Sequence, residues 1–158
     1  MHRVLVVCQH NVMRSPIMAF ELQSRLGADY QVRSRGLQQW HSREPDEGIL
    51  EVLRDYHPNP EIAKAYERHA PVRIEKRDVA KADLILVQTQ EQKSELLEKF
   101  EDARNKTFLV KELGGEGNLE IPDPKGQGIQ AQVDTMKSLG ELAPKVAEEI
   151  RKRLEQGN

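Results

Sequence analysis

Short apolar runs alternate with amphipathic segments along the chain, and this alternation predicts the fold. Val4–Val7 is an unbroken aliphatic run, which is typical of a strand buried on both faces of a parallel sheet. Asp83–Val87 contains a second such run, and Tyr30–Arg33 and Thr107–Val110 predict two shorter strands. Because helical spacing separates the strands, we expect an α/β fold in which a doubly wound, four-stranded parallel sheet has helices on both faces.

The segments between and after the strands have the spacing of helices. The first helix is expected to begin at Ser15-Pro16, with Ser15 as its N-cap, and to end at Gly27. Further helices are expected after Pro45, over Ile62–Arg68, around Leu96–Phe100 and over Ile129–Leu154. Pro144 is expected to kink or divide the last of these. Gly114–Gly128 is too rich in glycine and proline to form a regular element.

Length and charge limit what such a chain can do. Its 158 residues are the size of one ordinary domain, which we expect to span residues 1–158. The 24 basic residues nearly balance the 26 acidic ones, for a net charge of −2, which argues against a protein that binds nucleic acid through phosphate contacts. No apolar run approaches the roughly 20 residues of a membrane span, and the apolar part of Met1–Cys8 is too short for an export signal. We therefore expect a cytoplasmic protein with neither a membrane nor a nucleic-acid partner.

The sequence contains a single cysteine, Cys8. A lone cysteine excludes disulfides within the chain and metal sites built from several cysteines. Cys8 follows directly on the first predicted strand, and doubly wound sheets bind their ligands at the carboxyl ends of the strands. This position favours a functional thiol over a buried, inert one, in a site for which we expect no metal and no other cofactor.

The segment from Cys8 to Arg14 has the chemistry of an oxyanion site. Five residues separate these two side chains in a tight turn between a buried strand and a helix start. Backbone N–H groups of such a turn converge on an anion, the helix N-terminus adds partial positive charge, and the planar fork of Arg14 fits two phosphate oxygens. Asn11 tolerates the left-handed backbone that so tight a loop requires. A thiol in this field ionises readily, so the turn predicts a nucleophile that faces a bound phosphate.

Several motifs resemble those of the low-molecular-weight protein tyrosine phosphatases. The segment Cys8–Pro16 resembles their active-site loop, Cys-x-Gly-Asn-x-Cys-Arg-Ser-Pro, and Asp123-Pro124 resembles their late Asp-Pro pair. Ser34–Gly36 and His69 resemble weaker features of the same family, so the resemblance spans nearly the whole chain. It implies a single domain of the phosphotyrosine protein phosphatase I type, a fold shared with the related thioredoxin-type arsenate reductases.

The resemblance also implies a two-step hydrolysis of a phosphomonoester. Cys8 would attack phosphorus and form a phosphocysteine intermediate, while Arg14 and the loop amides hold the phosphate oxygens. Asp123 would protonate the leaving oxygen and then activate water, and Ser15 would hydrogen-bond the departing thiolate. Substrate contacts are expected from Gln9, His10, Asn11, Val12, Met13 and Trp40, and support of the loop through Asn11 from Ser34 and His69.

The same resemblance implies the partners of the protein. We expect a phosphorylated protein or a small aryl phosphate as substrate, with inorganic phosphate or a similar oxyanion as the occupant of the loop. We expect a monomer or a weak dimer. Val12 resembles the bulky aliphatic residue of the tyrosine phosphatases, because family members that cleave phosphoarginine carry threonine at this position.

Four positions depart from the family pattern. His10 replaces a glycine of the loop, and Met13 replaces the second loop cysteine, so an oxidised Cys8 has no partner for a disulfide. Lys125-Gly126 stands where an aromatic residue that flanks an aromatic substrate usually follows the Asp-Pro pair, which weakens the case for phosphotyrosine peptides and favours acidic substrates. Gln88-Thr89 replaces the usual Met-Asp after the third strand.

Two other functions remain open at this stage. An arsenate reductase that uses a small external thiol shares the fold and the loop, although such reductases usually carry glutamine where this chain has Pro16. A phosphate-binding module without catalysis would also use the loop. The presence of Cys8, Arg14 and Asp123 together speaks against this second alternative.

Overall fold

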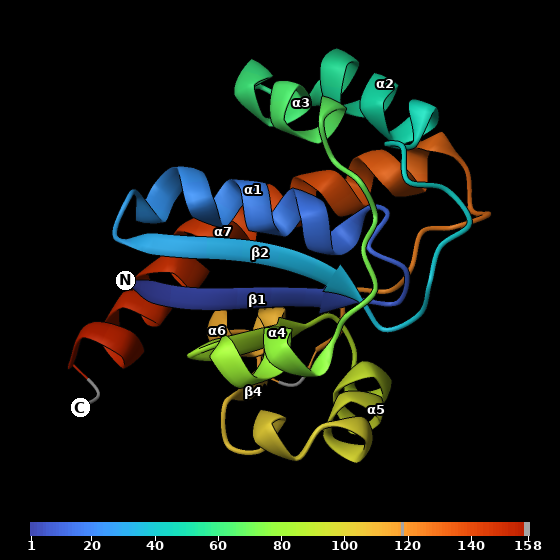
Figure 1. Ribbon diagram of the computed structural model, residues 1–158. Helices are drawn as coiled ribbons and strands as arrows, with labels where there is room; N and C mark the ends of the chain where they lie inside the picture. Colours follow the sequence, from blue (N-terminus) through green and yellow to red (C-terminus); the bar gives the residue numbers. More distant parts are fainter. Residues whose placement is uncertain (118, 157–158) are drawn as a thin grey trace.

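A parallel sheet of four strands in the order β2-β1-β3-β4 forms the centre of the molecule (Figure 1). The strands are β1 (His2–Cys8), β2 (Tyr30–Gly36), β3 (Leu84–Val87) and β4 (Thr107–Leu109). They are seen in a computed structural model, which describes residues 1–117 and 119–156. The predicted fold class, a four-stranded parallel sheet with helices on both faces, is confirmed.

Helices of unequal size cover the two faces of the sheet (Figure 1). The face with the longer helices holds α1 (Arg14–Leu26), α2 (Glu47–Tyr56), α3 (Pro60–Glu67), α6 (Val110–Leu113) and α7 (Ile129–Gln156). The other face holds α4 (Lys76–Lys81), α5 (Gln90–Lys99) and the short 3-10 helix η1 (Glu101–Ala103). None of the helices in the described ranges is long and apolar enough to cross a membrane.

The position of β1 in the sheet explains why Val4–Val7 are all apolar. Val4 and Val6 pack in the core beneath α1 and α7, while Leu5 and Val7 pack in the separate core beneath α4 and α5. Successive side chains of a strand point to opposite faces, and both faces of β1 are covered. All four side chains are therefore buried, with no more than 3% of each exposed.

Strand β1 is also the point at which the order of the strands reverses: the chain adds β2 on one side of β1 and β3 on the other. β1 pairs with β2 on one side and with β3 on the other, and Cys8 at its end lies opposite Gly36. Loops diverge at such a point, which leaves a crevice at the carboxyl ends of the strands. The fold therefore places Cys8 where doubly wound sheets bind ligands.

Several helix and strand boundaries differ from those that the local sequence pattern predicts. Helix α1 begins at Arg14 with Met13 as an N-cap that makes no side-chain hydrogen bond, so the prediction of Ser15 as N-cap is wrong. Helix α7 is a single helix through Pro144, because Leu139 and Val146 on either side of the proline are fully buried and packing holds the helix together. Val110 begins α6 and does not extend β4.

Gly36 allows the loop after β1 to approach β2. A Cβ atom at this position would lie 2.7 Å from the carbonyl carbon of His10 and 2.9 Å from the amide nitrogen of Asn11. These are backbone atoms, so relief requires the loop itself to move. The sequence Ser34-Arg35-Gly36 therefore ends in a residue that no other side chain can replace without displacing the loop.

We predict that Gly36→Ala destabilises the protein by about 1–3 kcal/mol, the usual cost of overpacking. Urea unfolding monitored by circular dichroism measures the change. Gly48→Ala in α2 is the matched control, because its Cβ would meet only the side chain of Asp46 and alanine favours helix. A Gly36→Ala protein as stable as the wild type would contradict this view of the loop.

Candidate active site

The turn between β1 and α1 is held at its base by the segment that follows β2. The amide of Leu37 donates to the carbonyl of Cys8 at 2.9 Å, and the amide of Gln38 donates to that of Gln9 at 2.8 Å. These bonds continue the pairing of the two strands past their ends. The loop is thus fixed to the sheet through its own backbone on the side of β2.

Asn11 holds the middle of the loop. It has the predicted left-handed backbone, with φ of 63°, and its side chain is fully buried. Its Nδ2 donates to Oγ of Ser15 at 2.8 Å, and its Oδ1 accepts from the amide of Val72 at 3.0 Å. The carbonyl of Asn11 accepts from Nε2 of His69 at 2.7 Å. Side-chain and backbone groups of one residue thereby join the loop to α1 and to the segment before α4.

Ser34 and His69 are the two residues predicted to support the loop through Asn11, and the structure places them differently. His69 makes the contact with Asn11 described above. Ser34 lies in β2 opposite Val6, and among the described residues no hydrogen bond joins it to Asn11. The amide of Val72 takes that place, because the turn of the loop directs the Asn11 side chain toward this segment.

Cys8 lies against the hydroxyl of Ser15. The distance from Sγ to Oγ is 2.9 Å, and both side chains are buried. Nδ2 of Asn11 donates to Oγ of Ser15, so the hydroxyl hydrogen can point either at the sulfur, 2.9 Å away, or at the Arg35 carbonyl, which is more distant at 3.5 Å. The geometry therefore suits a Ser15 hydroxyl that donates to a thiolate, a role that capping the helix would prevent.

Arg14 connects the loop with the segment that carries the predicted acid. Its Nη1 donates to the carbonyl of Ile121 at 2.8 Å, and its Nη2 lies 3.7 Å from Oδ2 of Asp123. Arg14 is buried, whereas the Asp123 side chain is 49% exposed. The amide of Lys125 donates to Oδ1 of Asp123 at 3.0 Å, which fixes the carboxylate at the mouth of the site.

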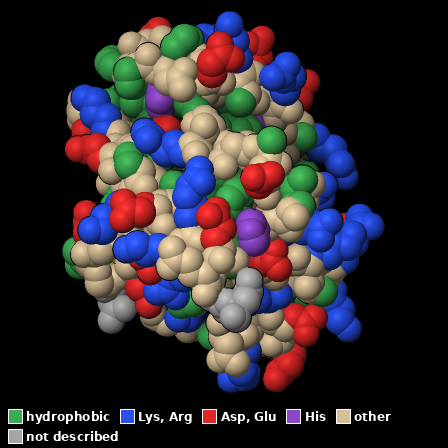
Figure 2. All heavy atoms as spheres, turned by 90° about the vertical axis from the view of Figure 1, so that its left-hand side faces the viewer, with side chains coloured by type: hydrophobic (Ala, Val, Ile, Leu, Met, Phe, Trp, Pro, Cys, Tyr) green, Lys and Arg blue, Asp and Glu red, His purple; other side chains and the backbone are tan. Residues whose placement is uncertain are grey.

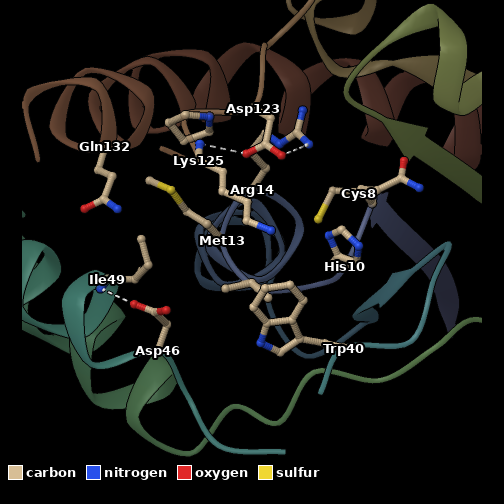
Figure 3. A pocket seen from close by; sticks show the side chains of 13 residues that line it. Cys8, His10, Met13, Arg14, Trp40, Asp46, Ile49, Asp123, Lys125 and Gln132 are labelled. Atoms are coloured by element: carbon tan, nitrogen blue, oxygen red, sulfur yellow. Dashed lines mark hydrogen bonds and ion pairs between the residues drawn. The ribbon is translucent and has the colours of Figure 1, made fainter. Parts of the chain in front are cut away.

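A pocket opens above these groups (Figure 3). Of the predicted site residues, its lining includes Cys8, Gln9, His10, Val12, Met13, Arg14, Trp40 and Asp123. The side chains of Asn11, in the middle of the loop, and of Ser15 are fully buried and are not part of this lining. Trp40 forms one wall, with its ring 5.0 Å from that of His10, and Nζ of Lys125 lies 4.8 Å above the indole. The structure thus brings the predicted nucleophile, arginine, acid and aromatic wall together.

Sequence reasoning missed residues that reach the site from distant elements. Asp46, at the start of α2, and Gln132 of α7 also line the pocket. The Tyr66 hydroxyl donates to the carbonyl of Val12 at 2.7 Å, and burial raises the pKa of Tyr66, so the hydroxyl remains a donor. A buried tyrosine in a short helix gives no local signal that its hydroxyl ends at a loop 54 residues away.

Gln88 connects the end of β1 with the segment that carries Asp123. Its Nε2 donates to the carbonyl of Val7, just before Cys8, at 3.2 Å. The backbone carbonyl of Gln88 accepts from the amide of Ile121 at 3.0 Å. The carbonyl of Ile121 in turn accepts from Arg14. The glutamine that departs from the family pattern thus lies between the nucleophile and the acid segment.

Comparison with known proteins places the chain in a family. The family model for low molecular weight phosphotyrosine protein phosphatase matches residues 3–156. The chain belongs to this family. It is accordingly a phosphatase, and its reaction proceeds through a phosphocysteine intermediate, the chemistry that the family resemblance implied.

Individual relatives match over nearly the whole length. A protein-arginine-phosphatase of Geobacillus stearothermophilus is 26% identical over 95% of this chain and 97% of its own. One of Bacillus subtilis is 27% identical over 94% of this chain and 97% of its own.

Solved structures show the same agreement. A YwlE arginine phosphatase mutant with a phosphorylated active-site serine has a TM-score of 0.83 and 25% identity, covering 97% of this chain and 98% of its own. Vibrio vulnificus Wzb in complex with benzylphosphonate has a TM-score of 0.80 and 26% identity, covering 94% of this chain and 98% of its own.

His69 gives this site a measurable dependence on pH. Burial lowers the pKa of His69 below its ordinary value, and the charge of Arg35 acts in the same direction, against the hydrogen bond to Asn11. A carbonyl only accepts, so the bond to Asn11 needs a proton on Nε2, which neutral imidazole supplies. Because protonation is easier in the unfolded chain, the stabilising contribution of His69 is complete above about pH 6.5 and is lost as pH falls through the folded value.

We predict that His69→Gln lowers the melting temperature most at pH 8 and least at pH 5. The amide of glutamine still donates a hydrogen bond but does not titrate. Thermal unfolding of both proteins across this range measures the difference between them. A difference that stays constant would show that folding leaves the pKa of His69 unchanged, and one that grows toward acid pH would show that folding raises it.

Proposed function

We propose that this phosphatase hydrolyses phosphotyrosine in proteins with Cys8 as nucleophile, Arg14 as phosphate-binding cation and Asp123 as general acid and base. The observation that carries the proposal is the position of Arg14. It lies in the loop beside Cys8 and contacts the segment of Asp123 through two of its nitrogens. A phosphate held by Arg14 would therefore have the thiolate on one side and the carboxyl group on the other.

In the first step, the Cys8 thiolate attacks phosphorus in line with the leaving oxygen. The P–S bond forms as the P–O bond breaks, and Asp123 gives its proton to the departing phenolate. Arg14 donates one hydrogen bond to the carbonyl of Ile121 and lies 3.7 Å from the carboxylate of Asp123, which leaves other N–H donors for the equatorial phosphate oxygens. Charge neutralisation by this guanidinium, the loop amides and the N-terminus of α1 supports a reaction that needs no metal.

In the second step, water attacks the phosphocysteine. Asp123, now a carboxylate, takes a proton from the water, and the P–S bond breaks to release inorganic phosphate. Cys8 leaves as a thiolate that the Ser15 hydroxyl, 2.9 Å away, stabilises. Asp123 is suited to both steps because it is half-exposed at the mouth, where a leaving group departs and water enters.

Phosphotyrosine is favoured by the walls of the pocket. Trp40 offers a face against which a phenyl ring packs, and Val12 adds an aliphatic side chain to the lining of the same pocket. Phosphoarginine is the second candidate, since the curated relatives described above are named protein-arginine-phosphatases. Asp46 also lines the pocket and would suit a guanidinium, but the Lys125 ammonium at the mouth would repel one.

The mechanism predicts the response to two substitutions. Cys8→Ser abolishes the turnover of p-nitrophenyl phosphate and of a phosphotyrosine peptide. Asp123→Asn lowers kcat for the peptide by about 10²–10⁴-fold, the usual worth of general acid–base catalysis, and has less effect on p-nitrophenyl phosphate, whose leaving group needs little protonation. Steady-state kinetics with EDTA present test both outcomes.

Other outcomes would overturn the mechanism. Turnover that survives Cys8→Ser, or that EDTA abolishes, is incompatible with it. Phosphate binding without turnover would support a binding module, and reduction of arsenate with thiol donors but no ester hydrolysis would support a reductase.

The substrate class predicts a second comparison. The wild type hydrolyses a phosphotyrosine peptide with a higher kcat/KM than the same peptide carrying phosphoarginine. Val12→Thr shifts the ratio of these two constants toward phosphoarginine by about 10-fold, the size of effect expected from one added polar contact in a pocket. Phosphate release from both peptides measures it, and a wild type that prefers phosphoarginine would establish the second candidate.

A further inference from the structure

Trp40 and the nitrogen-bearing side chains of His10 and Lys125 line the pocket (Figure 3), and the ring of His41 also packs against the indole. Nζ of Lys125 lies 4.8 Å from the centre of the indole, and the rings of His10 and His41 lie 5.0 Å and 4.3 Å from it. The three come from separate segments: the catalytic loop, the stretch after β2 and the turn that follows Asp123. We refer to His10, Trp40, His41 and Lys125 as the basic rim.

Lys125 is the permanent charge of this rim and has no carboxylate partner. Among the described residues, no salt bridge joins Lys125 to a carboxylate, although Asp123 lies in the same turn. The two carboxylates that line the pocket are engaged elsewhere: Asp123 lies beside Arg14, and Asp46 accepts from the amide of Ile49. The ammonium therefore lies at the entrance with the indole face as its neighbour, where a cation gains only modest stabilisation.

Lys125 is also fixed relative to the reacting atoms. Its backbone amide donates to Oδ1 of Asp123 at 3.0 Å, and the turn closes with a bond from the Gln127 amide to the carbonyl of Pro124. The residue that protonates the leaving group and the ammonium are thus two positions apart in one turn. A substrate placed for catalysis has its neighbouring residues within reach of this charge.

We propose that the basic rim binds a carboxylate of the substrate next to the phosphorylated residue, and that the enzyme selects phosphotyrosine in acidic sequences. The inference rests on the proposed function. With the phosphate in the loop and the phenyl ring against Trp40, the peptide backbone crosses the mouth. Adjacent residues of an extended peptide lie about 3.3 Å apart along the strand, so an Asp or Glu one or two positions away reaches Lys125.

The geometry gives the preference a direction. Asp46 lines the pocket on another side from Lys125 (Figure 3), and its charge disfavours an acidic residue placed there. We therefore expect acidic residues to be favoured on one side of the phosphotyrosine only. Positively charged neighbours are disfavoured at the same position, because they would meet the ammonium of Lys125.

Phosphotyrosine peptides that differ at one flanking position test the inference. For Glu, Gln and Lys at each position from −2 to +2, kcat/KM is expected to fall in that order on one side of the phosphotyrosine. The Glu-to-Lys ratio should be about 3- to 10-fold, as expected for exposed charges. Lys125→Gln brings this ratio close to one, Lys125→Glu inverts it, and 0.5 M salt reduces it in the wild type.

A matched control separates local charge from total charge. Lys152→Gln makes the same change in net charge in the last turns of α7, at the end of the molecule opposite the loop (Figure 1). Lysine, arginine and acidic side chains are interspersed on that face (Figure 2). The Lys152→Gln enzyme should keep the wild-type ratio, and thermal unfolding confirms that all variants are folded.

The outcomes also separate this inference from the proposed function. Cys8-dependent hydrolysis of phosphotyrosine peptides without a preference for Glu would overturn the inference and leave the proposed function standing. The same holds if Lys125→Gln and Lys152→Gln change the ratio equally. Peptides that are not hydrolysed at all would overturn the proposed function itself.

Discussion

The hydrogen bonds of Asn11 are the constraint on which the site depends. A loop of five residues between a nucleophile and an arginine closes only if one residue takes a left-handed backbone, which costs most residues about 1–2 kcal/mol. Asn11 meets this cost and satisfies three buried polar contacts at once, to Ser15, Val72 and His69. One of these contacts leads to α1 and the other two lead to the segment between α3 and α4, so the loop is held from both sides by the structure around it.

Arg14 extends this order to the other end of the chain. Its bond to the carbonyl of Ile121 joins residues 107 positions apart, and Ile121 is bound in turn by Gln88 at the end of β3. The predicted acid follows two residues later. The distance between nucleophile and acid is therefore set by buried contacts. Asp123 itself lies on an irregular segment whose glycine and proline content predicts no regular element.

The parts of this architecture that the sequence predicted are those in which local pattern and chemistry agree. Val4–Val7 was recognised because both faces of β1 are buried, and the loop because Cys8, Asn11 and Arg14 each have a property that an oxyanion site requires. The prediction of Ser15 as an N-cap is wrong because a capping serine needs its hydroxyl for a backbone amide of the helix. The Ser15 hydroxyl instead contacts Cys8 and Asn11.

What could not be predicted depends on contacts between distant segments. Tyr66 reaches the loop through the packing of α3 against α1, and Asp46 reaches the pocket through the packing of α2 against α3 and α7. No sequence pattern within α2 or α3 indicates either contact. The sequence pattern does not predict helix α4, because this helix has six residues and buries only Val79. The place of Ser34 as a support was taken by Val72, since the direction of the Asn11 side chain follows from the backbone of the loop and is not encoded in its own type.

The replacement of the second loop cysteine by Met13 has a chemical consequence that the structure sharpens. Met13 is 7% exposed and Cys8 is 3% exposed, so oxidants reach the nucleophile only through the pocket. If they do, the sequence holds no other thiol to capture the sulfenic acid as a disulfide. Protection then depends on what occupies the loop, because a bound oxyanion covers the sulfur. The same pocket that admits the substrate thus determines how long the nucleophile remains reduced.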